Sequence, residues 1–310
     1  MPSLWPEYHA HTAIPRDGVL AVVSFGEDPP PSSSLSVSVP MPQLASPIAE
    51  VWLTSEPVTR GETSGVRFAK TDAVMFGTIE VSGPTEAAAH TAYTRIVQAT
   101  AAEGYPHLIR LWNHVGDVNG EENGIERYKL FSAGRHDALT AHGYTRDRFP
   151  AASAVGMSRP GLVVYFIAAR EAGHHVENPR QVSAYDYPPR YGVRSPSFAR
   201  ATVSDSLIFV AGTSSVVGHE TKHPGSVSCQ LGETLKNLDV IIATAADRSN
   251  AKAGLTDLTM AKVYIRRSQD YGSIARELRE ALPQAALLFV ESDICRSDLL
   301  LEIEGVVRLS

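Results

Sequence analysis

Cysteine is nearly absent from this 310-residue sequence, which contains only Cys229 and Cys295 and no CxxC pair. So few cysteines argue against a disulfide framework. Neither residue has neighbours at the spacing of metal ligands, which also argues against a structural zinc site. The sequence therefore has to form its fold by burial of apolar side chains.

Histidines and glycines likewise lack the pattern of a cofactor site. His174 and His175 are adjacent, and His219 and His223 are four residues apart, but both segments are typical of loops and have no third ligand at motif spacing. The glycines around Gly212 form no GxGxxG pattern. We therefore expect neither a metal nor another cofactor.

Basic runs and long apolar runs are also missing. The formal net charge of −6 argues against binding to nucleic acid or to a membrane surface. The longest strongly apolar segment, 161–169, is about half of the ~20 residues that a transmembrane helix needs, and it predicts a buried strand. The start of the chain, MPSLWPEYHAHTAIPRDG, has prolines and an acidic residue where a signal peptide has a basic and then an apolar stretch. We expect a cytoplasmic protein.

Residues 1–45 are rich in proline and contain the run PPPSSS, a composition that predicts an irregular N-terminal segment. One apolar stretch within it, 19–25, fits an edge strand. Beyond this segment, apolar patterns predict a unit that occurs twice. Each copy runs strand, long helix, strand, second helix, strand.

The first copy is predicted from strands at 73–81, 105–115 and 161–169, with helices after the first two. The second copy is predicted from the segments 206–217, 232–247, 258–266, 270–282, 286–290 and 299–307. This repetition predicts a duplicated domain of the α+β class, with mixed sheets and with helices packed on one face of each sheet. We expect domains at 46–180 and 181–310.

The second copy resembles the RidA-like fold, also called chorismate mutase-like, in the segments IFVAGTSS, ETLKNLDVIIATA, LTMAKVYIRRSQDYGSI and LLLEIEGVV. That fold is usually a trimer with pockets between adjacent units. The resemblance implies that two tandem copies would form one such pocket within a single chain.

A closer resemblance, over about residues 70–310, is to the chorismatases. The motifs that carry it are WNHVGDVN, GIERYKLFSAGRHDAL, FPAASAVG, SAYDYPPRYGVRSPSFARA and FVAGTSSVVGHET. Chorismatases remove pyruvate from chorismate. The resemblance implies an enzyme that uses this substrate without a cofactor, as a monomer or small homo-oligomer.

Chorismate is a dicarboxylate, and arginine binds carboxylates in a planar, bidentate manner. Arg127 and Arg135 lie eight residues apart on one predicted helix. Each could bind a substrate carboxylate, but it is equally expected that they are solvated or pair with acidic residues at the surface. The aromatic- and proline-rich loop at 185–200 is a better candidate for a pocket lining. Its candidate substrate-binding residues are Tyr185, Tyr191, Arg194 and Arg200.

Cleavage of an enol ether begins with protonation of its terminal carbon, so the site needs an acid that is neutral near pH 7. Glu302 and Glu304 are two apart in an apolar strand and therefore lie on the same sheet face. From the pattern alone, both could instead point to solvent. The resemblance implies that Glu302 is the catalytic acid.

Two further residues bear on the product. The local sequence around Cys295 is typical of a small buried apolar residue. The resemblance implies a catalytic role, because the branch with cysteine here makes 3-hydroxybenzoate, whereas the branch without it hydrolyses chorismate to a dihydroxycyclohexadiene carboxylate. Ser214 stands where the resemblance leads us to expect alanine or glycine, and its hydroxyl could hold a water or a substrate oxygen.

These residues leave several functions open. We expect formation of 3-hydroxybenzoate and pyruvate, with the hydrolase or a 4-hydroxybenzoate-forming enzyme as alternatives. A RidA-like deaminase of enamines would have no use for the loop at 185–200. A non-catalytic binding protein would bind chorismate and release no pyruvate.

Overall fold

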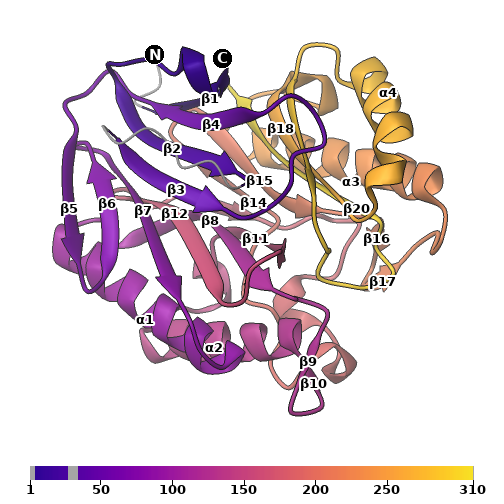
Figure 1. Cartoon of the computed structure of the whole chain (residues 1–310), viewed down its shortest axis with the longest axis horizontal. Coiled ribbons are helices and arrows are strands. Elements are labelled where there is room, and N and C mark those ends of the chain that lie inside the picture. Colours follow the sequence, from indigo (N-terminus) through magenta and orange to yellow (C-terminus); the bar gives the residue numbers. More distant parts are fainter. Residues whose placement is uncertain (1–3, 27–33, 310) are drawn as a thin grey trace.

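A computed structural model of the chain describes residues 4–26 and 34–309. Among these residues, three main sheets surround a shared interior, and four α-helices lie on the outside (Figure 1). The α+β class predicted from the sequence is confirmed. No helix in the described ranges is both long and apolar enough to span a membrane.

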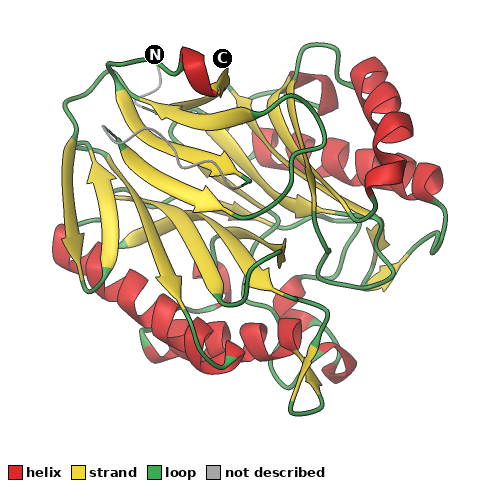
Figure 2. Cartoon of the chain, in the orientation of Figure 1, coloured by secondary structure: helices red, strands yellow, loops and turns green. Residues whose placement is uncertain are grey.

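The first six-stranded sheet carries two helices on its outer face (Figure 2). Its strands, in sheet order, are β11 (Ala151–Met157), β8 (His107–Gly116), β12 (Leu162–Ala169), β7 (Val74–Val81), β6 (Val66–Lys70) and β5 (Thr59–Thr63). Its helices are α1 (Thr85–Glu103) and α2 (Arg127–Ala141). A short hairpin of β9 (Glu121–Glu122) and β10 (Ile125–Glu126) precedes α2.

The second six-stranded sheet repeats this topology element by element. Its strands, in the equivalent order, are β19 (Ala286–Glu291), β18 (Leu258–Ile265), β20 (Leu301–Arg308), β15 (Leu207–Thr213), β14 (Ala201–Ser204) and β13 (His174–Val176). Its helices are α3 (Val227–Asp247) and α4 (Tyr271–Ala281), and β16 (Val216–Val217) and β17 (Glu220–Thr221) form a small hairpin. In both sheets the first two strands are parallel and the other pairs are antiparallel. The predicted duplication is therefore present.

The predicted boundary at residue 180 is displaced in the structure. Strand β13 lies before it in the sequence but pairs with β14 of the second sheet. The second unit therefore begins at about residue 174. The sequence hides this strand because it has only three residues, too few to show a period.

The prediction of an irregular segment over 1–45 was wrong for its described part. β1 (Trp5–Ala10), β2 (Val19–Phe25) and β3 (Leu35–Val39) join β4 (Ile48–Leu53) in a four-stranded sheet of order β1-β4-β2-β3. Strand β2 is an inner strand and is buried throughout. Of the described prolines in this part, only Pro6 lies in a strand, the edge strand β1, and the others lie between strands, so the composition misled the prediction. Most of the PPPSSS run lies outside the described residues.

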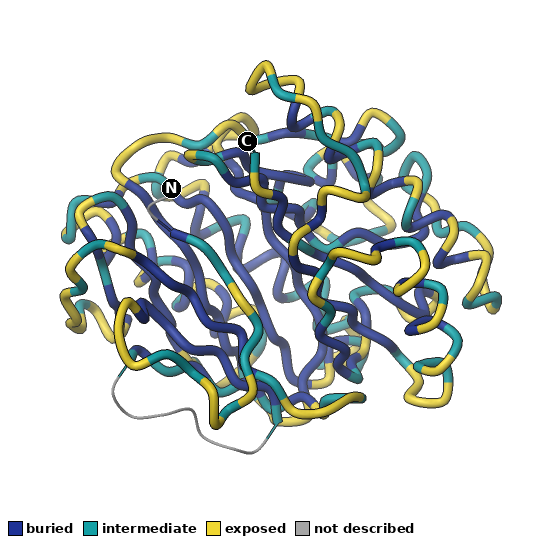
Figure 3. The backbone as a smooth tube through the Cα atoms, turned by 90° about the horizontal axis from the view of Figure 1, so that it is seen from above, coloured by how far each residue is buried: buried dark blue, intermediate teal, exposed yellow. Residues whose placement is uncertain are grey.

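The helix-free faces of the three sheets share one apolar core. Residues from each sheet contribute to it, among them Phe25, Trp52, Phe76, Trp112 and Phe209. Trp52 of the N-terminal sheet lies 5.6 Å from Trp112 of the first unit and 6.1 Å from Phe209 of the second, between ring centroids. Figure 3 shows these strands as the buried interior of the molecule, with exposed loops around them. The N-terminal sheet thus closes the third side of the core.

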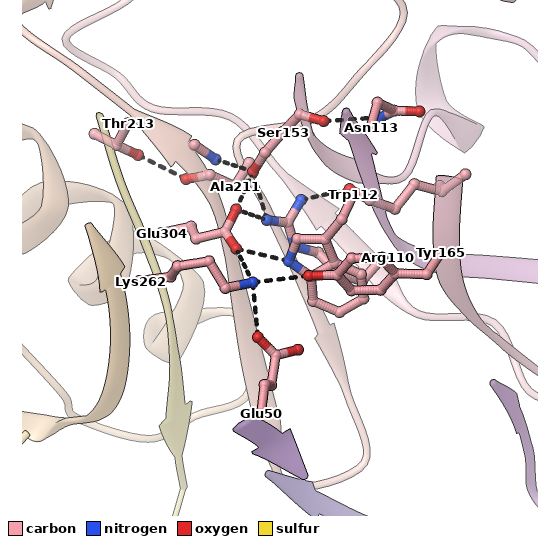
Figure 4. Close-up of polar contacts among 12 residues, drawn as sticks. Glu50, Arg110, Trp112, Asn113, Ser153, Tyr165, Ala211, Thr213, Lys262 and Glu304 are labelled. Carbon is pink, nitrogen blue, oxygen red and sulfur yellow. Dashed lines mark hydrogen bonds and ion pairs between the residues drawn. The ribbon is translucent and has the colours of Figure 1, made fainter. Parts of the chain in front are cut away.

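A buried lysine links the three sheets at this core (Figure 4). Lys262 Nζ, on β18, lies 2.7 Å from Glu50 of β4 and 3.0 Å from Glu304 of β20. It also donates a hydrogen bond of 2.8 Å to Tyr165 of β12. All three charged side chains are at most 4% exposed. A charge buried this deeply is tolerated only with such partners.

Replacement of Lys262 by methionine is expected to lower the free energy of unfolding by about 3–5 kcal/mol, because the buried carboxylates of Glu50 and Glu304 both lose a cationic partner. Chemical denaturation measures this loss. Lys252→Met, at an exposed position, is the matched control and should change stability little. A Lys262→Met protein as stable as this control would contradict the role assigned to the lysine.

Candidate active site

A cavity of about 330 Å³ lies where the two units meet. The first unit contributes residues of α2 and β11 to its wall. The second contributes β15, β20, the loop before β14 and the segment between β19 and β20. The resemblance implied a pocket formed by the two tandem copies, and residues of both copies line this cavity.

Glu302 lies in the cavity wall, although its side chain is only 4% exposed. Burial, followed by the negative charge of Glu304, raises the pKa of this carboxyl to about 8. The Oγ of Ser214 lies 3.4 Å from Glu302 Oε2 and donates a hydrogen bond of 3.0 Å to the Leu301 carbonyl. Glu302 is therefore mostly protonated at neutral pH and able to donate a proton.

Gly212 makes room for this carboxyl. A Cβ atom at position 212 would lie 1.8 Å from Glu302 Oε1, so only glycine fits beneath the acid. The Gly212 amide donates a hydrogen bond of 2.8 Å to Ser153 Oγ of the first unit. The close approach fixes Glu302 at the junction between the two units.

Glu304 lies on the same strand but carries the opposite protonation state. Burial alone would raise its pKa, but the neighbouring charges of Lys262 and Arg110 lower it to about 2. Arg110 Nη2 and Trp112 Nε1 donate hydrogen bonds of 2.7 Å and 2.8 Å to it, and Ser153 Oγ donates another (Figure 4). Both glutamates are thus buried, which rules out the alternative that they point to solvent.

Two buried arginines of the cavity wall retain unused donors. Arg135, on α2, is 1% exposed, and its Nε and Nη2 have no hydrogen-bond partner. Arg200 donates a hydrogen bond of 2.6 Å to the Tyr187 hydroxyl, but its Nε has no partner. The guanidinium groups lie 5.7 Å and 4.9 Å, respectively, from the ring centroid of Phe198. Buried donors without partners are costly, and an anion in the cavity would satisfy them.

Cys295 also lines the cavity and is partly buried. Burial, followed by the charge of Glu302, raises the pKa of its thiol to about 12. The residue is therefore a neutral thiol, which is a poor nucleophile and a poor base. Its contribution to the cavity is an apolar surface beside the acid.

The other predicted site residues divide into two groups. Tyr191 and Ser214 line the cavity with the residues above. Three others do not line it and have partners elsewhere: Arg127 pairs with Asp117 and Glu122, Arg194 lies 2.9 Å from Asp137, and Tyr185 packs against Phe149. Arg127, Arg194 and Tyr185 therefore lie outside the cavity in which the sequence predicted them.

Several cavity residues were not selected from the sequence. They are Tyr128, Ser153, Gln181, Tyr187 and Arg296. Ser153 lies in the FPAASAVG motif, Tyr187 in the loop at 185–200, and Arg296 directly after Cys295, so the motifs held a signal for them. Arg296 lies 4.4 Å from the ring centroid of Tyr191, and Tyr191 donates a hydrogen bond of 2.6 Å to the His219 carbonyl.

Infrared difference spectroscopy can test the protonation of Glu302 without any substrate. We expect a protonated carboxyl band at neutral pH that titrates with a midpoint of about 8. Glu302→Gln should remove the component that titrates near 8 and leave that of Glu177, whose pKa burial raises to about 7. A midpoint close to ~4.3, the ordinary glutamate value, would contradict the assigned state.

Known proteins match this chain over most of its length. Residues 50–168 match the family described as "Chorismatase FkbO/Hyg5-like, N-terminal". A 3-hydroxybenzoate synthase of Streptomyces hygroscopicus is 41% identical over 279 residues, covering 85% of this chain and 82% of that protein. A chorismatase of Streptomyces rapamycinicus is 40% identical, covering 84% and 82%.

A solved structure matches the whole fold, including the N-terminal sheet. It is a crystal structure of a chorismatase, with 32% sequence identity, a TM-score of 0.90 and 98% coverage of both chains. Identity and coverage at this level, together with a duplicated fold and a cavity between its units, show that the chain belongs to the chorismatase family.

Proposed function

We propose that this chain cleaves the enol ether of chorismate and releases pyruvate, with Glu302 as the general acid. The observation that carries the proposal is a buried, protonated carboxyl in the same cavity as two buried arginines with unused donors. The first group supplies the proton that the reaction needs. The others are suited to a dianionic substrate.

Arg135 and Arg200 are the proposed carboxylate ligands. Each is held by aromatic neighbours and keeps at least one N–H free, so an entering carboxylate replaces no existing ion pair at those donors. Two such cations from different units would fix the substrate across the junction. Because one chain supplies both, we propose that activity needs no partner subunit.

The proposed reaction begins at the methylene carbon of the pyruvyl group. Glu302 gives its proton to this carbon, and the positive charge develops at the ether carbon and oxygen. The bond between the ring carbon and the ether oxygen then breaks, its electron pair stays on that oxygen as the new ketone, and the departing group is pyruvate. If the ring's own hydroxyl displaces the pyruvyl oxygen, the ring loses one proton as it becomes aromatic, and that proton restores the carboxyl.

The product that we propose is 3-hydroxybenzoate. This product and pyruvate together contain the atoms of chorismate, so the route consumes no water and no oxidant. A neutral Cys295 beside the acid favours it by occupying space that a reactive water would need. The 3-hydroxybenzoate synthase that matches this chain supports the same assignment.

Hydrolysis to the dihydroxycyclohexadiene carboxylate is the second candidate, because the Ser214 hydroxyl lies beside Glu302 and could orient a water. A 4-hydroxybenzoate-forming reaction would give a different aromatic isomer. Incubation with chorismate, followed by chromatography of the products, separates the three. A deaminase or a binding protein would release no pyruvate.

Glu302→Gln is expected to lower the rate of pyruvate release by about 10²- to 10⁴-fold, because the amide cannot donate a proton to carbon. Purified protein and chorismate suffice for the assay, with pyruvate quantified over time. A variant with a near-normal rate would contradict the proposed acid.

Arg135→Lys is expected to raise the KM for chorismate by about 10- to 100-fold, because lysine cannot reproduce the planar donor pair, a loss of ~1.5–3 kcal/mol. Arg194→Lys is the matched control, since Arg194 lies outside the cavity. Equal KM values for the two variants would count against Arg135 as a carboxylate ligand.

A further inference from the structure

The segment Asp293–Leu299 connects β19 to β20 and carries Cys295 and Arg296 in the cavity wall. It has no helix and no named strand of its own. Irregular backbone keeps a defined shape only when other groups satisfy its carbonyls and amides. The contacts that hold this segment therefore decide where Cys295 lies.

One arginine donates to three of the seven carbonyls in this segment. Arg266, just after β18, donates from Nε to the Leu299 carbonyl at 2.6 Å. Its Nη2 donates to the carbonyls of Ile294 at 3.1 Å and Arg296 at 2.8 Å. Two of the three accepting carbonyls flank Cys295 directly.

The remaining group of Arg266 reaches the side chains around the segment. Its Nη1 donates to the Asp293 carboxylate and, at 3.0 Å, to Asn119 Oδ1. The five hydrogen bonds match the five N–H donors of a guanidinium, and the side chain is only 12% exposed.

Asn119 brings the first unit into the same contact. It ends the WNHVGDVN motif, and its Nδ2 donates a hydrogen bond of 3.0 Å to the Ile294 carbonyl. The side-chain amide of Asn119 therefore accepts a hydrogen bond from Arg266 and also donates one to the segment. At the far end, buried Gln230 of α3 accepts from the Leu300 amide and donates to the Asp298 carbonyl, each at 2.8 Å.

We propose that Arg266 and Asn119 are positioning residues that hold Cys295 against the acid and thereby control whether water enters the reaction. Neither residue lines the cavity, so they act through the segment and do not touch the substrate. Gln230 fixes the β20 end, and β11 holds the other end through the Gly156 amide on the Asp293 carbonyl and a bridge between Val155 and Ile294. Between these anchors, Arg266 donates to both carbonyls that flank Cys295, and Asn119 donates to one of them. The part of this inference that concerns the product rests on the proposed function.

The position of Cys295 can be measured without chorismate. In a Cys229→Ser background, which removes the exposed thiol, iodoacetamide labelling followed by mass spectrometry reports on Cys295 alone. Wild-type Cys295 should react slowly. Arg266→Lys keeps the positive charge but loses the planar set of guanidinium donors. In this variant Cys295 should be labelled at least ~10-fold faster, because the thiol reaches water and its pKa falls.

Arg267→Lys is the matched control, because Arg267 is adjacent and exposed. It should label at the wild-type rate. Asn119→Ala is the second variant if Arg266→Lys does not fold, and it should also label faster. Labelling of both Arg266→Lys and Asn119→Ala at the wild-type rate would overturn the proposal, whether or not the protein acts on chorismate.

The product ratio separates positioning from a general loss of stability. With chorismate, Arg266→Lys should still release pyruvate, within about 10-fold of the wild-type rate, but with a larger share of the hydrolysed diene acid. A substitution that only weakened the fold would lower the melting temperature and leave the share of diene acid unchanged. That result would contradict the proposal that Arg266 controls the product. An absence of pyruvate from the wild-type protein would instead refute the proposed function, and the labelling result would stand.

Discussion

The site depends on two glutamates that lie two residues apart on β20 and are held in opposite charge states. Lys262 and Arg110 keep Glu304 ionised, with its pKa lowered to about 2. The charge of Glu304 adds to burial in raising the pKa of Glu302 to about 8. One strand thus places a fixed negative charge directly behind a proton donor. Neighbouring carboxyls with separated pKa values are a recurring way to define acid and base roles at one pH.

The fold supplies this arrangement through the meeting of its three sheets. Lys262 is tolerated in the core because its ammonium group pairs with Glu50 of the N-terminal sheet and with Glu304 of the second unit. Ser153 of the first unit donates to Glu304 and accepts from Gly212, the residue that makes room for Glu302. The N-terminal sheet therefore contributes to the electrostatics of the site without lining the cavity, and the duplication contributes the cavity itself.

The sequence predicted what depends on local pattern and missed what depends on distant partners. The duplicated helices and long strands show their periods. The apolar stretch at 19–25 also predicted a strand, but β2 is an inner strand only because β3 and β4 flank it, which the local pattern does not show. Arg127 and Arg135 are eight residues apart, which turns them about 80° from each other on α2, and only Arg135 faces the cavity. The resemblance singled out Glu302. The ionised state of Glu304 depends on Lys262, which lies on another strand, so the sequence of β20 alone could not predict it.

The pH dependence of kcat/KM for pyruvate release tests the central claim most directly, because it reports the ionisation of the free enzyme. Glu302 has a raised pKa and acts in its protonated form, so the rate should be sustained below that pKa and lost as the pH rises through about 8. This limb should be absent from the residual activity of Glu302→Gln. A wild-type kcat/KM that is already lost as the pH rises from about 4 to 5, the range in which an ordinary glutamate ionises, would contradict the account.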